Sequence, residues 1–229
     1  KIDYVFMLYN DRFFMAEQIS NPKEYKERDE TRPVFDPLAV TSIRLAKILI
    51  NLSEAEHEIL DLFCGTGTIL QEALLSGYRV IGIDKQIADA KKNVASLGKE
   101  RSKRATLIQG DARRLSSLMK KVEAVVTEPY MGPYMKKIPM NDEAQQIIAS
   151  LTDLYREVFR EAARIVEGKI VIVIPRIRTY TSKFDIPMNA LLKEAGLKVS
   201  SPVPSITLPI FYPKKRSKID RFVYILEKA

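Results

Sequence analysis

The chain has 229 residues, of which 46% are hydrophobic, so it can bury a sizeable core in one or two domains. Its 37 Lys and Arg outnumber its 29 Asp and Glu, and the net charge of +8 favours a polyanionic partner, nucleic acid first, over the alternative of a generic basic surface. One Cys and one His exclude an internal disulfide and a zinc site made by this chain alone, and no apolar run approaches the roughly 20 residues that span a bilayer. We therefore expect a protein of a reducing, cytoplasmic compartment, with no membrane segment and no metal.

An N-terminal extension, residues 1–31, is expected to precede the main domain, residues 32–229. Within it, residues 4–9 and 12–17 are rich in aromatic and apolar residues and are separated by a two-residue polar turn, a pattern typical of a β-hairpin. Residues 22–31 are mostly charged, which favours a surface linker.

The main domain begins with a helix that Thr41 is placed to cap. The next pattern is a short apolar strand ending at Asp61, a turn containing Gly65 and Gly67, and a helix ending near Gly77. Two glycines let the backbone approach a ligand closely, and the free N–H groups that begin the helix attract a negative group. Such a turn alone is weak evidence, because many α/β proteins contain one.

Three further apolar runs lead into an acid in the same way, at Asp84, Asp111 and Glu128. Asp84 lies about 20 residues beyond the glycine turn, where nucleoside-binding α/β folds place the acceptor for the ribose hydroxyls. Because the carboxyl ends of parallel strands meet at one edge of a sheet, we expect four carboxylates, with Asp61, to line one crevice there.

The C-terminal half supplies the remaining elements of the predicted sheet. A long amphipathic helix is predicted at about residues 142–167, and a fully apolar, central strand at residues 169–174. The last two strands are expected around residues 198–208 and 221–226, with no helix between them. The pattern as a whole predicts an α/β, doubly wound, Rossmann-like sheet of seven strands.

Ten residues from Asp61 onward, D-L-F-C-G-T-G-T-I-L, resemble the first S-adenosylmethionine motif of RNA guanine-N2 methyltransferases, which reads D-P-F-C-G-T-G-T/G-I-L. Residues 32–37, R-P-V-F-D-P, are similar to that family's R-P-F-F-x-P segment, and residues 125–132, V-V-T-E-P-Y-M-G, are similar to its V-V-T-D-P-P-Y-G. The members that this chain resembles most are archaeal and eukaryotic enzymes that methylate the guanosine at position 10 of tRNA. The resemblance covers roughly residues 30–229 and implies the class I methyltransferase version of the sheet.

The resemblance implies a site for S-adenosyl-L-methionine, with the methionine end at the glycine turn, the ribose at Asp84 and the adenine beside Asp111. It also implies that the segment before the first helix closes over the cofactor, for which a simple strap is the alternative. The cofactor-binding residues expected on this basis are Asp61, Phe63, Gly65, Gly67, Thr68, Asp84, Asp111 and Ala112, together with Phe35 and Pro37 in that segment. A Rossmann dehydrogenase is the alternative, but the third glycine of its motif is missing at the usual spacing.

The resemblance further implies that Glu128, Pro129 and Tyr130 form the catalytic turn. In the family an acid or amide side chain and a neighbouring backbone carbonyl accept from the exocyclic amine, and an aromatic ring stacks on the extruded base. This chain departs from the pattern twice, because Glu128 replaces the usual Asp and Tyr130 stands where a second proline is expected. Either the turn is reshaped so that Tyr130 or Tyr134 stacks on the base, or the substrate differs, or activity is lost.

Basic residues fall in loops that are predicted near the carboxyl ends of the later strands. Contacts of Lys and Arg with phosphate give affinity for RNA without sequence choice. The RNA-binding residues expected are Lys136, Lys137, Arg176, Arg178, Lys214, Lys215 and Arg216. Scattered solvated charge is the alternative.

The leading hypothesis is an S-adenosylmethionine-dependent tRNA guanine-N2 methyltransferase of the position-10 type. A second is N6-adenine methylation of DNA or another RNA, since a similar acid-proline-aromatic turn serves adenine amines, and a third is an RNA-binding relative that has lost transfer. The order of the motifs and the segment at residues 32–37 favour the guanine enzymes. Family members normally carry an N-terminal RNA-binding THUMP domain, which nothing in this sequence resembles, and some need a small zinc-binding activator protein. The partners expected are therefore tRNA and such a protein.

Overall fold

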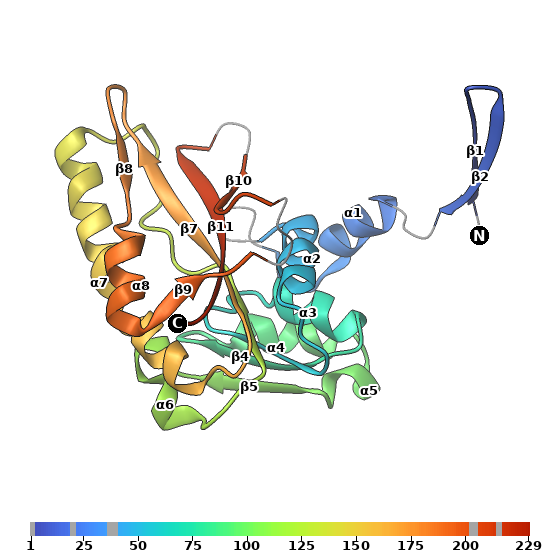
Figure 1. Cartoon of the computed structure of the whole chain (residues 1–229). Coiled ribbons are helices and arrows are strands. Elements are labelled where there is room, and N and C mark those ends of the chain that lie inside the picture. Colours follow the sequence, from blue (N-terminus) through green and yellow to red (C-terminus); the bar gives the residue numbers. More distant parts are fainter. Residues whose placement is uncertain (1–2, 19–21, 36–40, 202–205, 214–216) are drawn as a thin grey trace.

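The structure is a computed structural model that describes residues 3–18, 22–35, 41–201, 206–213 and 217–229. Figure 1 shows a twisted sheet with helices on both of its faces, and a β-hairpin beyond helix α1 (Pro22–Thr31). The doubly wound α/β fold expected from the sequence is confirmed.

The main sheet contains β3 (Glu58–Asp61), β4 (Arg79–Asp84), β5 (Ala105–Gln109), β6 (Ala124–Thr127), β7 (Ile170–Arg178), β10 (Ile210–Tyr212) and β11 (Ile219–Lys228). These seven strands form its main path, in the order β10-β11-β7-β6-β3-β4-β5. Strands β3 to β7 pair in parallel, whereas β11 is antiparallel to both β7 and β10. Parallel strands lie on both sides of β3, so their carboxyl ends meet at one edge of the sheet. Ligands bind to such sheets at this edge.

The strand predicted around residues 198–208 is wrong in position. The structure has two short strands instead: β9 (Leu197–Val199), which pairs with β11, and β10, which forms one edge of the main path beside β11. Pro202 and Pro204 in the predicted run have no N–H to donate to a ladder, a signal against one continuous strand that the prediction overlooked. A further short strand, β8 (Lys183–Asp185), pairs with β7 and was not predicted.

Helices cover both faces of the sheet. One face carries α2 (Ile43–Leu52), α3 (Thr68–Leu75) and α4 (Ala88–Ala95), the other carries α6 (Leu115–Leu118), α7 (Asn141–Ile165) and α8 (Met188–Ala195), and the short α5 (Lys99–Ser102) and 3-10 helix η1 (Ala112–Arg114) lie in the connections (Figure 1). Successive strand residues point to opposite faces, so Ile59 packs in the core under α2 to α4 while Leu60 packs in the core under α7 and α8. The sheet therefore separates two hydrophobic cores. None of the helices in the described ranges is both long and apolar enough to span a membrane.

The N-terminal hairpin is confirmed as β1 (Asp3–Tyr9) paired with β2 (Arg12–Gln18) in a two-stranded sheet of its own. Asn10 and Asp11 both have positive φ, 47° and 54°, as a two-residue turn of type I′ requires. Large apolar side chains of this hairpin are exposed, with Leu8 at 71%. The division of the chain after residue 31 stays a prediction.

Residues 22–31, predicted as a surface linker, form helix α1. The charge that favoured a linker is used in a contact, because Arg28 donates two hydrogen bonds, of 3.2 and 3.0 Å, to Glu72 of α3, whose side chain is 3% exposed. The next helix begins one residue later than expected. Ser42, not Thr41, caps α2, because its Oγ accepts a backbone N–H of the first turn at 3.2 Å.

Candidate active site

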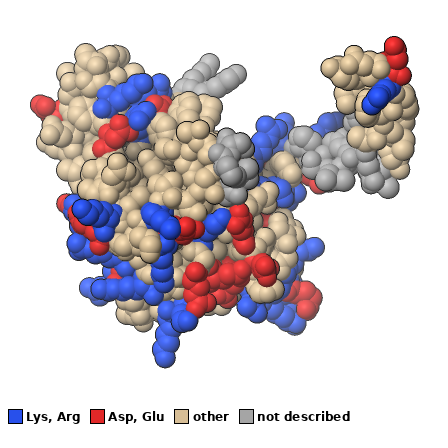
Figure 2. Space-filling view, viewed as in Figure 1, with Lys and Arg blue, Asp and Glu red and all other residues tan. Residues whose placement is uncertain are grey.

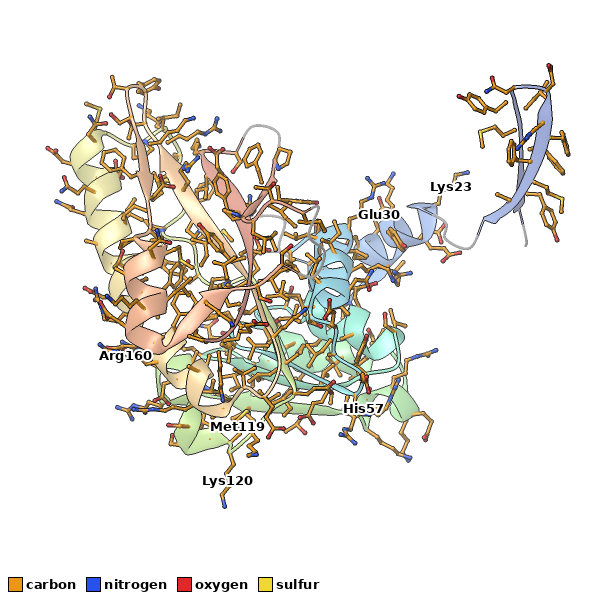
Figure 3. The ribbon with its side chains drawn as sticks, in the orientation of Figure 1. Lys23, Glu30, His57, Met119, Lys120 and Arg160 are labelled. Atoms are coloured by element: carbon orange, nitrogen blue, oxygen red, sulfur yellow. The ribbon has the colours of Figure 1, made fainter. Side chains whose placement is uncertain are left out.

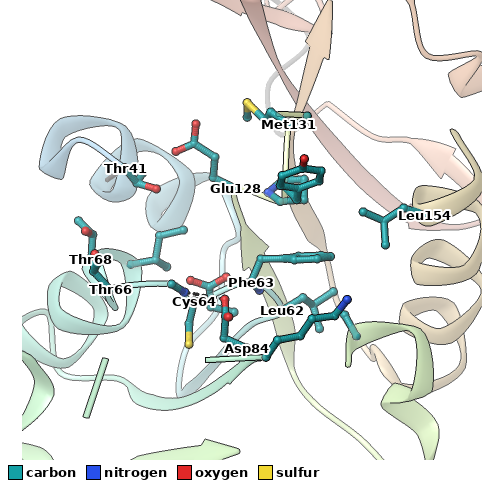
Figure 4. A pocket seen from close by; sticks show the side chains of 18 of the residues that line it. Thr41, Leu62, Phe63, Cys64, Thr66, Thr68, Asp84, Glu128, Met131 and Leu154 are labelled. Atoms are coloured by element: carbon teal, nitrogen blue, oxygen red, sulfur yellow. Dashed lines mark hydrogen bonds between the residues drawn. The ribbon is translucent and has the colours of Figure 1, made fainter. Parts of the chain in front are cut away.

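A cleft of about 990 Å³ opens at the carboxyl ends of β3 to β6. Asp61, Asp84, Asp111 and Glu128 end or closely follow these strands, and all four line the cleft. The expectation that four carboxylates share one crevice is therefore confirmed. Figure 4 shows Glu128 and Asp84 on opposite sides of the cleft, with Phe63 between them in this view. Asp111 and Glu128 are paired with basic residues, whereas Asp61 and Asp84 have no ion pair within the described residues, so their end of the cleft favours a ligand group with positive charge.

The glycine turn forms the floor of one end of the cleft. Gly65 and Gly67 both have positive φ, 48° and 84°, which residues other than glycine rarely adopt. Asp84 braces the turn, because its Oδ2 accepts the N–H of Gly65 at 2.9 Å. Gly65 and Thr68 line the cleft, whereas Gly67 faces α4, where a Cβ would lie 3.4 Å from Ala90. Gly67 thus serves helix packing and begins α3 rather than lining the cleft.

Asp61 is the most buried of the four acids, with 2% of the residue exposed. Burial raises its pKa from 3.8 to about 7, although hydrogen bonds from Thr127 and from the backbone N–H of Phe63 lower it. The Thr127 Oγ1 hydrogen bond is 2.8 Å and the Phe63 bond is 3.2 Å, both to Oδ1. Near neutral pH the carboxyl group therefore exists in both protonation states, and a positive charge in the cleft favours the ionised one.

The next two acids differ in how much of their hydrogen-bonding capacity is used. Asp84 accepts one backbone N–H on each oxygen, from Gly65 and from Gln86 at 3.0 Å, and keeps further lone pairs. Asp111 is bound by Arg113 through contacts of 2.7 and 3.1 Å, and these hydrogen bonds hold its pKa well below the usual range. Ala112, beside it, is buried and lines the cleft. A ligand at Asp111 has to share the carboxylate with Arg113.

Glu128 follows β6 directly, and its side chain is 11% exposed. Its Oε1 accepts a hydrogen bond of 2.8 Å from Nε of Arg221, which comes from β11 and also lines the cleft. Sequence reasoning missed Arg221. The available signal was a single arginine within the otherwise mostly apolar run of the last strand.

Pro129 and Tyr130 complete the turn and line the cleft. The hydroxyl of Tyr155, a buried residue of α7, donates to the backbone carbonyl of Tyr130 at 2.8 Å and so holds the turn against α7. The rings of Tyr130 and Tyr134 also line the cleft, and the two residues are 54% and 67% exposed. Both rings are available to an aromatic ligand.

The segment before α2 is tied to the glycine turn through Asn93 of α4, which the sequence did not single out. Asn93 Oδ1 accepts the N–H of Val34 at 2.9 Å, while its Nδ2 donates to the carbonyls of Val34 and Thr66 at 2.9 and 2.8 Å. Phe35 is 48% exposed and is not among the described residues that line the cleft. Pro37 lies outside the described residues. Asn93 thus joins Val34 to the glycine turn, while closure of this segment over the cofactor stays a prediction.

Two of the predicted RNA contacts are exposed on the loop before α7, namely Lys136 and Lys137. The guanidinium groups of Arg176 and Arg178 already pair with acids, Asp185 at 2.6 Å and Asp220 at 3.2 Å. Lys214, Lys215 and Arg216 fall outside the part of the chain that the structure describes. On the face in Figure 2, basic side chains are spread among acidic ones rather than gathered in one strip. An RNA-binding role for these seven residues stays a prediction.

Comparison with known proteins identifies relatives of this domain. Among curated proteins, the tRNA (guanine(10)-N2)-dimethyltransferase of Pyrococcus abyssi is 30% identical over 211 residues, which are 90% of this chain and 55% of that protein. The protein of the same name from Methanothermobacter thermautotrophicus is 39% identical over 134 residues, 55% of this chain and 38% of that protein. The chain thus spans about half, or less, of the length of these relatives. Among solved structures, TrmN from Thermus thermophilus aligns over 100% of this chain and 60% of that one, with 19% identity and a TM-score of 0.57, which shows a shared fold.

A sequence profile of the RMKL-like methyltransferase domain matches residues 30–186. This range includes β3 to β7 and every acid of the cleft described above. Because the match extends over more than half of the chain, the chain belongs to the family of RMKL-like methyltransferase domains.

Proposed function

We propose that this domain transfers a methyl group from S-adenosylmethionine to the exocyclic N2 amine of a guanosine in tRNA. The observation that carries the proposal is the meeting of the glycine turn and the Glu128-Pro129-Tyr130 turn in one cleft. The names of the archaeal relatives support guanine N2 and tRNA as the target, and the net charge of +8 supports a polyanionic substrate. A small zinc-binding activator protein and a cytoplasmic location stay predictions from the sequence.

The residues at the glycine end of the cleft fit S-adenosylmethionine, which supplies a methyl group on a positively charged sulfur. Asp84 keeps acceptor capacity for ribose hydroxyls beyond the two N–H groups that it already accepts. Gly65 leaves its backbone open to the cleft, because a Cβ there would meet nothing within 4 Å and the φ of +48° selects glycine. Phe63 and Ala112 offer apolar surface for an adenine ring, and Asp61 adds negative charge near the cationic end.

At the other end, the reaction requires that the lone pair of the amine points at the methyl carbon. The amine nitrogen forms the new N–C bond while the S–C bond of the donor breaks, so the donor leaves as a neutral thioether and the amine releases one proton to Glu128 or to solvent. Glu128 accepts a hydrogen bond from the amine, and the Pro129 carbonyl is the adjacent acceptor. Two acceptors on one amine fix the direction of its lone pair, and such positioning accounts for much of a rate.

The contacts of the turn favour a reshaped catalytic turn over a lost one. Glu is one methylene longer than Asp, and a misplacement of about 1 Å can cost about 100-fold in rate. In this chain Arg221 holds the longer Glu128 side chain through the 2.8 Å hydrogen bond. Tyr130 and Tyr134 supply exposed rings in the cleft for stacking on an extruded base.

Incubation with bulk tRNA and labelled S-adenosylmethionine, followed by identification of the labelled nucleoside, tests the proposal. We expect N2-methylated guanosine. Labelled N6-methyladenosine would replace the proposal by the adenine hypothesis. No labelled nucleoside, together with normal cofactor binding, would indicate an RNA-binding relative that has lost transfer.

Variants of Glu128 test the role of the catalytic turn. Glu128→Ala and Glu128→Gln should keep cofactor affinity near normal and slow transfer, because the contact with the amine belongs to the reacting geometry. Gln retains an acceptor oxygen and should lose less than Ala. Glu128→Asp withdraws the carboxylate from Arg221 and should also be slower than the parent in single-turnover methylation. Parent-like rates for all three variants would remove Glu128 from the mechanism.

A further inference from the structure

The pair of Glu128 and Arg221 carries hydrogen-bonding groups that the protein itself does not use. The two side chains are 11% and 16% exposed, and both residues line the cleft. Their mutual hydrogen bond uses Oε1 of the acid and Nε of the arginine. Within the described residues, Oε2 of Glu128 accepts no hydrogen bond, and the buried Nη1 of Arg221 has no partner. A buried charged donor without a protein partner is unfavourable, so the pair has hydrogen-bonding capacity for a third group.

The chemistry of the pair selects the edge of a base that would complete it. A carboxylate only accepts hydrogen bonds, and a guanidinium only donates them. The Watson–Crick edge of guanine has two adjacent donors, N1–H and N2–H, followed by the acceptor O6. A carboxylate beside a guanidinium matches that order. Adenine instead has its N6 donors next to the lone pair of N1, which would face a carboxylate oxygen and repel it.

On the basis of the proposed function, we propose that Glu128 and Arg221 together read the guanine edge of the target nucleoside. Glu128 accepts from N1–H and N2–H, while Arg221 donates to O6 and holds the carboxylate in place through Nε. Arg221 is then a positioning and specificity-determining residue for the transfer. It comes from β11, at the other end of the domain sequence from the glycine turn, and it does not contact the proposed cofactor residues in any described hydrogen bond.

The alternative is that Arg221 only holds β11 against the turn, and a base analogue separates the two roles. The target guanosine, once located by nucleoside mapping, is replaced by 2-aminopurine, which keeps the 2-amino group but lacks both O6 and N1–H. The parent should methylate guanosine at least about 100-fold faster than 2-aminopurine, because the analogue leaves polar groups of the site unpaired. Arg221→Met keeps the apolar length of the side chain and removes its donors. It should slow transfer to both bases, because it releases the Glu128 carboxylate, but the loss on guanosine should be roughly 10- to 100-fold larger, because only guanosine has the O6 to which Arg221 donates.

A matched control and a second variant complete the experiment. Arg160 points outward from α7 (Figure 3) and pairs with Glu194 at 3.3 Å, so Arg160→Met should leave both rates unchanged. Arg221→Lys keeps one charged donor group and should prefer guanosine over 2-aminopurine to an intermediate degree. If Arg221→Met misfolds and loses cofactor binding, the ratio of the two rates in Arg221→Lys decides whether Arg221 recognises the base.

The outcomes distinguish this inference from the proposed function. If Arg221→Met prefers guanosine over 2-aminopurine less than the parent does, with cofactor affinity unchanged, the result supports recognition of the base edge by Arg221. An equal loss on guanosine and on 2-aminopurine would assign Arg221 a structural role only and overturn the inference, while the methylation itself stands. A parent enzyme that methylates no guanosine in tRNA would instead refute the proposed function, and with it the basis for this reading.

Discussion

The carboxyl group of Asp61 should make the domain less stable as the pH rises, and Asp61→Asn should remove this effect. Burial raises the pKa of Asp61 from 3.8 to about 7, against hydrogen bonds that lower it. The folded state therefore keeps a proton that the unfolded chain releases above pH 3.8. The stabilising contribution is complete below that pH and is lost as the pH rises through about 7.

The size of the effect follows from the interval between the two pKa values. One pKa unit corresponds to about 1.4 kcal/mol, so the interval from 3.8 to about 7 limits the change in unfolding free energy to about 4 kcal/mol. Asn has nearly the shape of Asp, keeps an oxygen that accepts from Thr127, and carries no charge at any pH. The difference in unfolding free energy between Asp61→Asn and the parent should therefore shift in favour of the variant by up to about 4 kcal/mol as the pH rises from 4 to 8.

Urea denaturation of parent and variant at closely spaced pH values measures this difference. Leu70→Ala is the control, because Leu70 is fully buried and has no titrating group. It should lower the unfolding free energy by about 2–5 kcal/mol, by a similar amount at every pH. A difference between Asp61→Asn and the parent that stays constant from pH 4 to pH 8 would refute the reasoning.

Three further predictions concern the supports of the cleft. Asp84→Ala should weaken binding of S-adenosylmethionine by roughly 1–3 kcal/mol in calorimetry, and unchanged affinity would remove Asp84 from the ribose site. Tyr155→Phe removes the donor to the Tyr130 carbonyl and should slow single-turnover transfer while cofactor affinity stays normal. A parent-like rate would mean that the turn keeps its conformation without this hydrogen bond. Asn93→Ala breaks the three hydrogen bonds that join Val34 to the glycine turn, so it should lower both stability, by about 1–3 kcal/mol in denaturation, and cofactor affinity. An unaltered denaturation midpoint would show that these three hydrogen bonds do not stabilise the domain.

The parts of the site that the sequence predicted are those in which local pattern and chemistry coincide. A glycine turn between a strand and a helix, and acids that follow apolar runs, are visible within a few residues of one another. Arg221, by contrast, lies 93 residues from its partner Glu128, and Asn93 lies 59 residues from Val34. Pairing over such distances depends on the order of strands and helices in space, which no local pattern contains. Helix α1 was missed for a related reason, because the partner that holds its charge is a buried acid of α3.

The two cores support two parts of the cleft, the glycine turn and the Tyr130 carbonyl, from opposite faces of the sheet. The glycine turn rests on the core under α2, α3 and α4, where Gly67 faces Ala90, whereas the Tyr130 carbonyl is held by Tyr155, which belongs to the core under α7 and α8. Substitutions that are well separated and share no partners have nearly additive effects on stability. Changes at Tyr130 and Tyr134 can therefore accumulate with little effect on the methyl-donor half, whereas Thr127, which donates to Asp61, joins the two halves. A lineage built on this sheet is free to exchange one amine acceptor for another while its donor stays the same.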